Sequence, residues 1–145
     1  MRTCPECGAS YEAADANCAR RFEALLALDH SRNEPWGSRH GLAFSAYAIQ
    51  HSDRFPPDVL ERAWILLYKV YVNGEDYRRV TDALRRSGRR NPDWELPPVP
   101  QSRPRPHFAV TIADLGSFPS ETYPQQLEDW CKASLQAWRE LPADR

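Results

Sequence analysis

The sequence carries almost no excess charge of either sign, and this argues against several classes of partner. Lys and Arg together number 19 and Asp and Glu 20, so the formal net charge is −1. No global field therefore attracts nucleic acid or an anionic membrane surface. Lysine is nearly missing as well, because all the basic residues except Lys69 and Lys132 are Arg.

Long apolar runs are also missing. No segment approaches the roughly 18 consecutive apolar residues of a membrane-spanning helix, and the N-terminus has no apolar core of a signal peptide. We therefore expect a cytoplasmic protein with no membrane partner. Thiols stay reduced in that compartment, so a cysteine pair is interpreted first as a metal-binding or catalytic site.

Several catalytic signatures are absent too. The sequence has no Gly-rich phosphate loop, no HExxH, no GxSxG and no paired-carboxylate motif. The sequence therefore predicts no particular reaction and leaves open whether the protein is an enzyme.

The first feature that the sequence does contain is a predicted amphipathic helix at 40–51. His40, Phe44, Tyr47 and His51 recur at helical spacing and share one face of it. The two histidines are about 16 Å apart along this helix, at 1.5 Å per residue. They cannot bind the same ion, so each needs its own explanation.

Periodicity and capping signals predict an all-α fold of roughly five helices in one domain, residues 1–145. We expect helices near 18–30, 40–51, 58–73, 75–87 and 123–140, with 58–73 as the central, largely buried one. The predicted division is an N-terminal zinc knuckle at 1–16, a four-helix core at 17–88, a strap at 89–110 and a C-terminal helical segment at 111–145. The strap is rich in Pro, and a disordered linker is the alternative.

The strongest chemical signal is the motif Cys4-Pro-Glu-Cys7-Gly8. A CxxC turn followed by Gly lets two thiolates point at one ion while backbone N–H groups support the sulfurs. A structural zinc ion needs four ligands. Cys18 at the first turn of the next helix is the third candidate, because the helix dipole favours a thiolate there.

The expected topology suggests the fourth ligand. A short loop joins the helices at 18–30 and 40–51, so they should pack antiparallel, with Cys18 near His51 and far from His40. We therefore predict one Zn²⁺ held by Cys4, Cys7, Cys18 and His51. The alternatives for the fourth position are His40, or an Asp, water or other group.

Other interpretations of the cysteines stay open. A thioredoxin-like redox CxxC would follow a strand in a βαβ unit, which is not predicted here. The pair could also be two reduced cysteines that lie together by coincidence. Cys131 lies on the apolar stripe of the last helix and is interpreted as a small buried hydrophobe.

A second candidate site lies at the other end of the helix at 40–51. His40 could act as a general base or ligand contact in a pocket with Asp29, Trp36, Tyr47 and Gln50, with Asp29 as its orienting carboxylate. The simpler interpretation is a histidine that bridges two helix ends through hydrogen bonds.

These features support three hypotheses of function. The first is a zinc-binding helical protein with a structural ion that acts through contacts with another protein. The second is a metal- or histidine-dependent enzyme with a pocket near His40. The third is a nucleic-acid-binding adaptor that uses the Arg-rich run from Arg78 to Arg90. Acidic residues are interspersed in this run, so a solvated helix face is the favoured interpretation and a nucleic-acid partner is not expected.

The chain also resembles an uncharacterised bacterial family of small helical proteins that contain cysteine and histidine and form a domain of unknown function. The resemblance rests on the segments CPECGA, CARRFEALLALD, HGLAFSAYAIQHSD and VTIADL…DWCKASLQAW. It implies a common fold and a common metal site built from Cys4, Cys7, Cys18 and a histidine, and it implies no reaction. The family pattern leads us to expect an acidic residue at position 45 and a proline at position 52. This chain departs from it, because it has Ser45 and Ser52 there.

Overall fold

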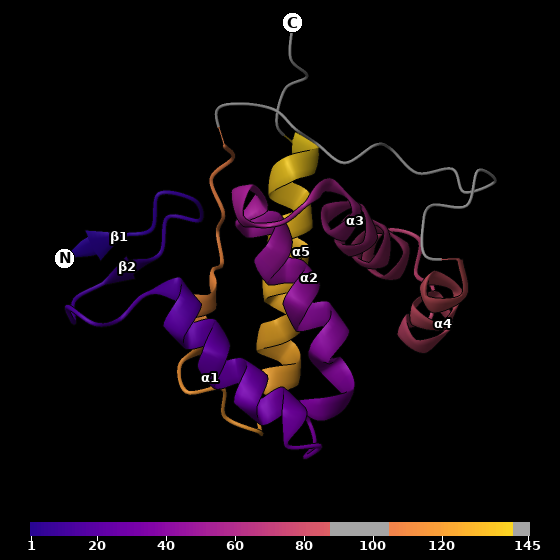
Figure 1. Cartoon of the computed structure of the whole chain (residues 1–145), viewed down its shortest axis with the longest axis horizontal. Helices are drawn as coiled ribbons and strands as arrows, with labels where there is room; N and C mark the ends of the chain where they lie inside the picture. Colours follow the sequence, from indigo (N-terminus) through magenta and orange to yellow (C-terminus); the bar gives the residue numbers. More distant parts are fainter. Residues whose placement is uncertain (88–104, 141–145) are drawn as a thin grey trace, which may run out of the picture.

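The protein is a mostly helical molecule in a computed structural model that describes residues 1–87 and 105–140. Within this range the α-helices are α1 (Cys18–His30), α2 (His40–Gln50), α3 (Pro57–Tyr71), α4 (Tyr77–Ser87) and α5 (Tyr123–Glu140) (Figure 1). Short 3-10 turns are η1 (Gly37–Arg39), η2 (Ser52–Arg54) and η3 (Ile112–Leu115), and the strands are β1 (Arg2–Thr3) and β2 (Ser10–Tyr11). The predicted helical class is confirmed. The predicted Pro-rich strap falls largely on residues 88–104, outside the described residues.

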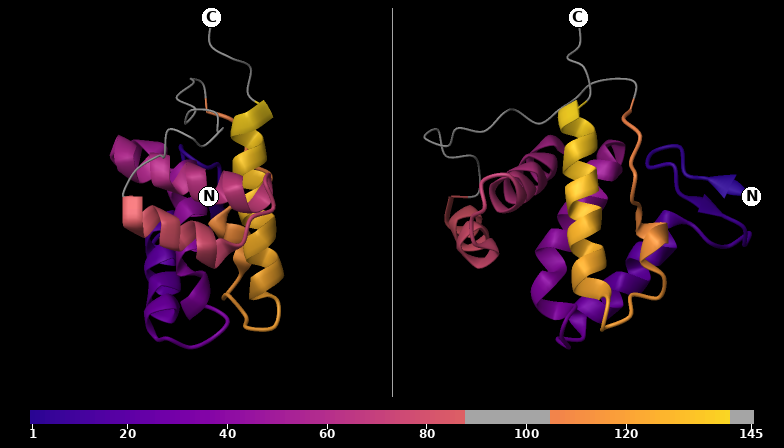
Figure 2. Two further views of the ribbon diagram at one scale, coloured as in Figure 1. Left: turned by 90° about the vertical axis from the view of Figure 1, so that its right-hand side faces the viewer. Right: turned by 180° about the vertical axis from the view of Figure 1, so that it is seen from behind.

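Helix α2 is the centre of the bundle, where it packs mainly against α3 and α5 (Figures 1 and 2). Its small side chains explain this position, because Ala43, Ala46 and Ala48 are fully buried and let the neighbouring helices approach closely. The expectation that the helix at 58–73 would be central was therefore wrong. A wide apolar arc predicts how much of a helix surface is buried. A run of small residues predicts how closely the neighbouring helices can approach it.

Helices α1 and α2 run in opposite directions, as the short connection between them predicts (Figure 1). The Asn17 side chain caps the start of α1 by accepting from the backbone N–H of Arg20 at 2.9 Å. Stacking of the Phe22 and Tyr47 rings, with centroids 4.0 Å apart, joins the two helices. The beginning of α1 consequently lies beside the end of α2.

The N-terminal segment forms a small hairpin in which β1 pairs antiparallel with β2. Its turn contains the CxxC motif and closes through two backbone hydrogen bonds, from Cys4 N–H to Ala9 O at 2.7 Å and from Gly8 N–H to Cys4 O at 2.9 Å. Gly8 has a φ of 85°, which side chains rarely tolerate, so glycine suits this position.

The segment that enters α5 runs extended along the bundle (Figure 2, right). The Gln50 amide donates to Val110 O at 2.7 Å, and Phe108 is buried near Trp138. Thr111 and Asp114 then form a capping box around η3. These contacts join the C-terminal helix to the same hydrophobic core as α1–α4.

Candidate metal centre

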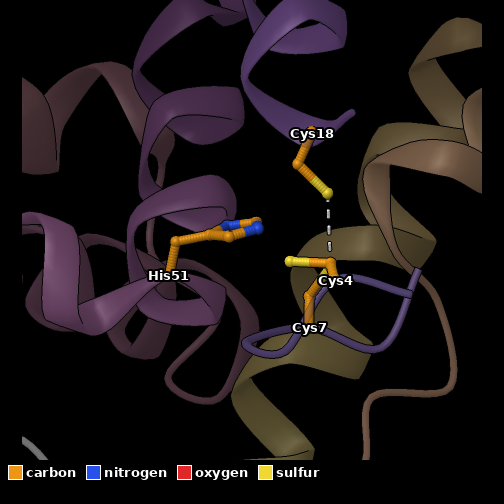
Figure 3. A group of neighbouring side chains, drawn as sticks. All are labelled: Cys4, Cys7, Cys18 and His51. Atoms are coloured by element: carbon orange, nitrogen blue, oxygen red, sulfur yellow. Dashed lines mark hydrogen bonds between the residues drawn. The ribbon is translucent and has the colours of Figure 1, made fainter. Parts of the chain in front are cut away.

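Four side chains from three parts of the chain converge where α1 begins and α2 ends (Figure 3). The hairpin turn supplies Cys4 and Cys7, the first residue of α1 supplies Cys18, and the residue after α2 supplies His51. Their ligand atoms all lie within 4.8 Å of one another. The structure thus brings together the four residues that spacing and topology had singled out, and such a group could hold a metal ion.

The three cysteines are free thiols, and the geometry of their sulfurs suits a shared ion. The Cys7 and Cys18 sulfurs are 3.5 Å apart, well beyond the roughly 2.05 Å of a disulfide bond. In a tetrahedron with Zn–S bonds of about 2.3 Å, two sulfurs lie roughly 3.8 Å apart. A zinc ion therefore fits between these sulfurs with little movement.

The two ring nitrogens of His51 have different environments. Nδ1 donates to the Tyr47 carbonyl oxygen at 2.8 Å, which leaves the lone pair on Nε2. Nε2 is buried and finds no hydrogen-bond partner within the described part of the chain. A ligating histidine typically has this arrangement, in which a backbone carbonyl fixes the tautomer and the other nitrogen faces the metal.

The cysteine sulfurs interact electrostatically with each other and with a tyrosine. A hydrogen bond with Cys7, together with one to Tyr11, lowers the pKa of the Cys18 thiol to about 4 in spite of its burial. The same Cys7–Cys18 hydrogen bond, followed by burial, raises the pKa of Cys7. Cys18 is thus the more acidic thiol of the pair, and its sulfur lies 3.1 Å from the Tyr11 hydroxyl, within hydrogen-bond distance.

An ion pair fastens the CxxC turn to the helical body. Arg54 Nε donates to Glu6 Oε1 at 2.6 Å, and Arg54 Nη1 donates to the Tyr47 hydroxyl at 2.9 Å. Sequence reasoning missed Arg54, Glu6 and Tyr11. Glu6 lies inside the CxxC motif and Arg54 follows His51 by three residues, so the sequence already indicated that both lie near the ligands. Their pairing with each other depends on the tertiary fold.

The residues of the second candidate site do not gather in one place. Trp36 Nε1 donates to Phe118 O at 2.9 Å, and the Gln50 amide faces Val110 and Ser134. Tyr47 lies beside His51, with ring centroids 4.2 Å apart. Among the residues predicted to line a pocket with His40, these three therefore make their contacts elsewhere.

His40 does meet the carboxylate nominated as its partner. His40 Nδ1 lies 2.9 Å from Asp29 Oδ2, and the Asp29 side chain is 0 % exposed whereas that of His40 is 40 % exposed. This contact joins the end of α1 to the start of α2, as the simpler interpretation predicts.

The remaining candidates, the Arg-rich run and Cys131, lie in the environments that their simpler interpretations predict. Arg78, Arg79, Arg85 and Arg86 are exposed on α4, next to exposed Asp82, and the last two arginines of the run lie outside the described residues. Cys131 is completely buried, as expected for a small core residue.

Comparison with known proteins adds a family and no activity. A family model described as "Family of unknown function (DUF5946)" matches residues 2–139. No curated protein and no solved structure matches the chain. A search of the described helices finds none with the length and apolar character needed to cross a membrane.

Proposed function

The chain belongs to this family of unknown function, and from the site that it carries we propose that it is a zinc-binding protein whose ion is structural. Cys4, Cys7, Cys18 and His51 hold one Zn²⁺ and complete its tetrahedron. With four protein ligands, no coordination position remains open for a substrate, and the ion connects the hairpin to the two helix ends.

The observation that carries this proposal is the buried, unpartnered Nε2 of His51. Leaving a buried acceptor without a partner costs about 1–3 kcal/mol. A metal ion offsets that cost directly, and it also neutralises the thiolates that the site brings together. Three soft thiolates and one imidazole in a tetrahedral arrangement favour zinc over the hard cations that prefer oxygen ligands.

The proposed role follows from where the site lies. The hairpin pairs only two residues in each strand, and a hairpin of this size is marginal in water without further support. Zinc binding supplies folding free energy to such a segment. We further propose that the surface organised in this way acts through contact with another protein.

Metal analysis of the purified protein tests the proposal. We expect one zinc per chain in wild type and in Cys131→Ser, a matched control whose thiol lies outside the cluster. Replacement of zinc by Co²⁺ should give an intense sulfur-to-cobalt charge-transfer band and the visible spectrum of a tetrahedral site. Wild-type protein purified under reducing conditions without stoichiometric metal, or an octahedral cobalt spectrum, would overturn the proposal.

A further inference from the structure

A cavity of about 350 Å³ opens beside the proposed zinc site. It is lined by the start of α1 and by β1, and two of the cluster residues, Cys4 and Cys18, belong to its wall. The other two, Cys7 and His51, do not line it. One side of the site is therefore approachable from solvent, although four protein ligands surround the ion.

The cluster residues differ in exposure. Cys4 is partly exposed, whereas Cys7, Cys18 and His51 are buried. The four donor atoms themselves lie below the surface, so a reagent has to be small enough to enter the cavity. Hydrogen peroxide meets this requirement, and thiolates are the species that it oxidises.

We propose that Cys4 is a modification site for peroxide and that its oxidation releases the zinc ion. This inference rests on the zinc site proposed above. The class of reagent is a small hydroperoxide, and the product is a disulfide between Cys4 and a neighbouring ligand thiol, Cys7 or Cys18.

The chemistry balances in two steps. The Cys4 sulfur attacks one peroxide oxygen, the O–O bond breaks, and the products are a sulfenic acid and hydroxide, which takes up a proton to form water. The second thiolate attacks the sulfenic sulfur, an S–S bond forms, the S–O bond breaks, and a second water leaves after protonation. Two thiolates lose two electrons, and the peroxide gains them.

The geometry allows the second step without unfolding. All ligand atoms lie within 4.8 Å of one another, and a disulfide needs about 2.05 Å, so the sulfurs have to move by less than about 3 Å. The disulfide removes two of the four zinc ligands at once. Zinc release then frees the hairpin from the helices until a thiol reductant restores the site.

The test uses zinc-loaded protein, hydrogen peroxide and a colorimetric zinc indicator. We expect zinc release in parallel with disulfide formation. Proteolysis after Glu6 and Glu12 separates the three cysteines, so mass spectrometry can identify the pair, which should include Cys4. Ala19→Trp places a large side chain at the cavity wall from an exposed position and should slow zinc release several-fold. Ala27→Trp, exposed further along α1, is the matched control and should release zinc at the wild-type rate.

The outcomes separate this inference from the zinc proposal. Purified protein without zinc would refute the zinc site itself. Protein that binds zinc but keeps it after peroxide treatment would refute the inference alone. So would a disulfide between Cys7 and Cys18 with Cys4 free, or equal release rates for Ala19→Trp and Ala27→Trp.

Discussion

Among single residues, His51 is buried, and its two ring nitrogens have different environments. Its Nδ1 is held by a carbonyl oxygen one turn earlier, and its Nε2 faces the thiols. We expect His51→Gln to lose stoichiometric zinc and to lower the free energy of unfolding by about 3 kcal/mol, because a ligand is removed from a buried site. Metal analysis and denaturant unfolding measure the two effects.

The control for this substitution is His107→Gln, which changes an exposed histidine in the segment before η3. It should retain zinc and change stability by less than about 0.5 kcal/mol. Full zinc content in His51→Gln would show that His51 is not the fourth ligand.

Tyr11 acts on the site through the Cys18 sulfur. Its hydroxyl lies 3.1 Å from that sulfur and would donate to it once zinc holds the sulfur as a thiolate. We expect Tyr11→Phe to keep zinc but to weaken its affinity by about 10–100-fold, the usual effect of removing a group that supports a ligand. Competition with a chelator of known affinity measures this. Unchanged affinity would show that the hydroxyl contributes only to packing.

The apparent affinity for zinc should fall as pH falls. Zinc binds thiolates, and the hydrogen bond with Cys18 together with burial raises the pKa of Cys7, so the metal-free site keeps a proton that zinc has to displace. Lower pH favours the protonated, metal-free form, and higher pH favours the zinc-bound form. Chelator competition from mildly acidic to mildly alkaline buffer checks this sign, and an affinity independent of pH over that range would contradict it.

At the scale of elements, helix boundaries were largely predictable because capping residues mark them. Asn17 caps α1 as its position predicts. The predicted start of α4 at residue 75 was early, because the Asp76 side chain accepts from the Arg79 N–H and the helix begins at Tyr77. Glu75 is instead paired with Lys69 across the preceding turn. Because Asp is a favoured N-cap residue, the sequence itself carried the signal for this later start.

The contact between α2 and α4 depends on a glycine. A Cβ on Gly41 would lie 2.8 Å from the Tyr77 hydroxyl oxygen, which accepts from the Gly41 N–H. Gly41→Ala should therefore destabilise the protein by about 1–3 kcal/mol, the usual cost of overpacking, even though Ala is the better helix former.

A double-mutant cycle isolates that clash. In a Tyr77→Phe background the hydroxyl is gone, and Gly41→Ala should become neutral or stabilising, because the helix propensity of Ala then outweighs the steric cost. Denaturant unfolding of the four proteins measures the coupling. Equal costs of Gly41→Ala in both backgrounds would show that the hydroxyl is not what glycine accommodates.

At the scale of the whole molecule, the convergence of the hairpin turn, the start of α1 and the end of α2 was predictable from one topological step. A short loop makes consecutive helices antiparallel, so residues at the start of one and the end of the next become neighbours. Which helix occupies the centre was not predictable in this way. The close packing of α2 against α3 and α5 depends on contacts between residues far apart in sequence.

The molecule thus has a helical core and a hairpin that the proposed ion attaches to it. The core of α2, α3 and α5 buries large side chains such as Trp64, Leu67 and Trp130, none of which belongs to the metal-binding group. Bound zinc stabilises the folded protein by about 4 kcal/mol when its free concentration is a thousand times Kd. Chelation of zinc should therefore lower the melting temperature while most of the helical circular dichroism remains.

Hydrogen exchange locates the change that chelation causes. Amides in residues 1–17 should lose protection, because the two-stranded hairpin has little support of its own, whereas amides in α2 and α5 should stay protected. The His51→Gln variant is the matched control, since a chelator should change nothing further in it. Complete loss of the helical signal on chelation would mean that the ion stabilises the entire fold. Unchanged protection of residues 1–17 would mean that side-chain contacts, such as the ion pair between Arg54 and Glu6, are enough to hold the hairpin against the helices.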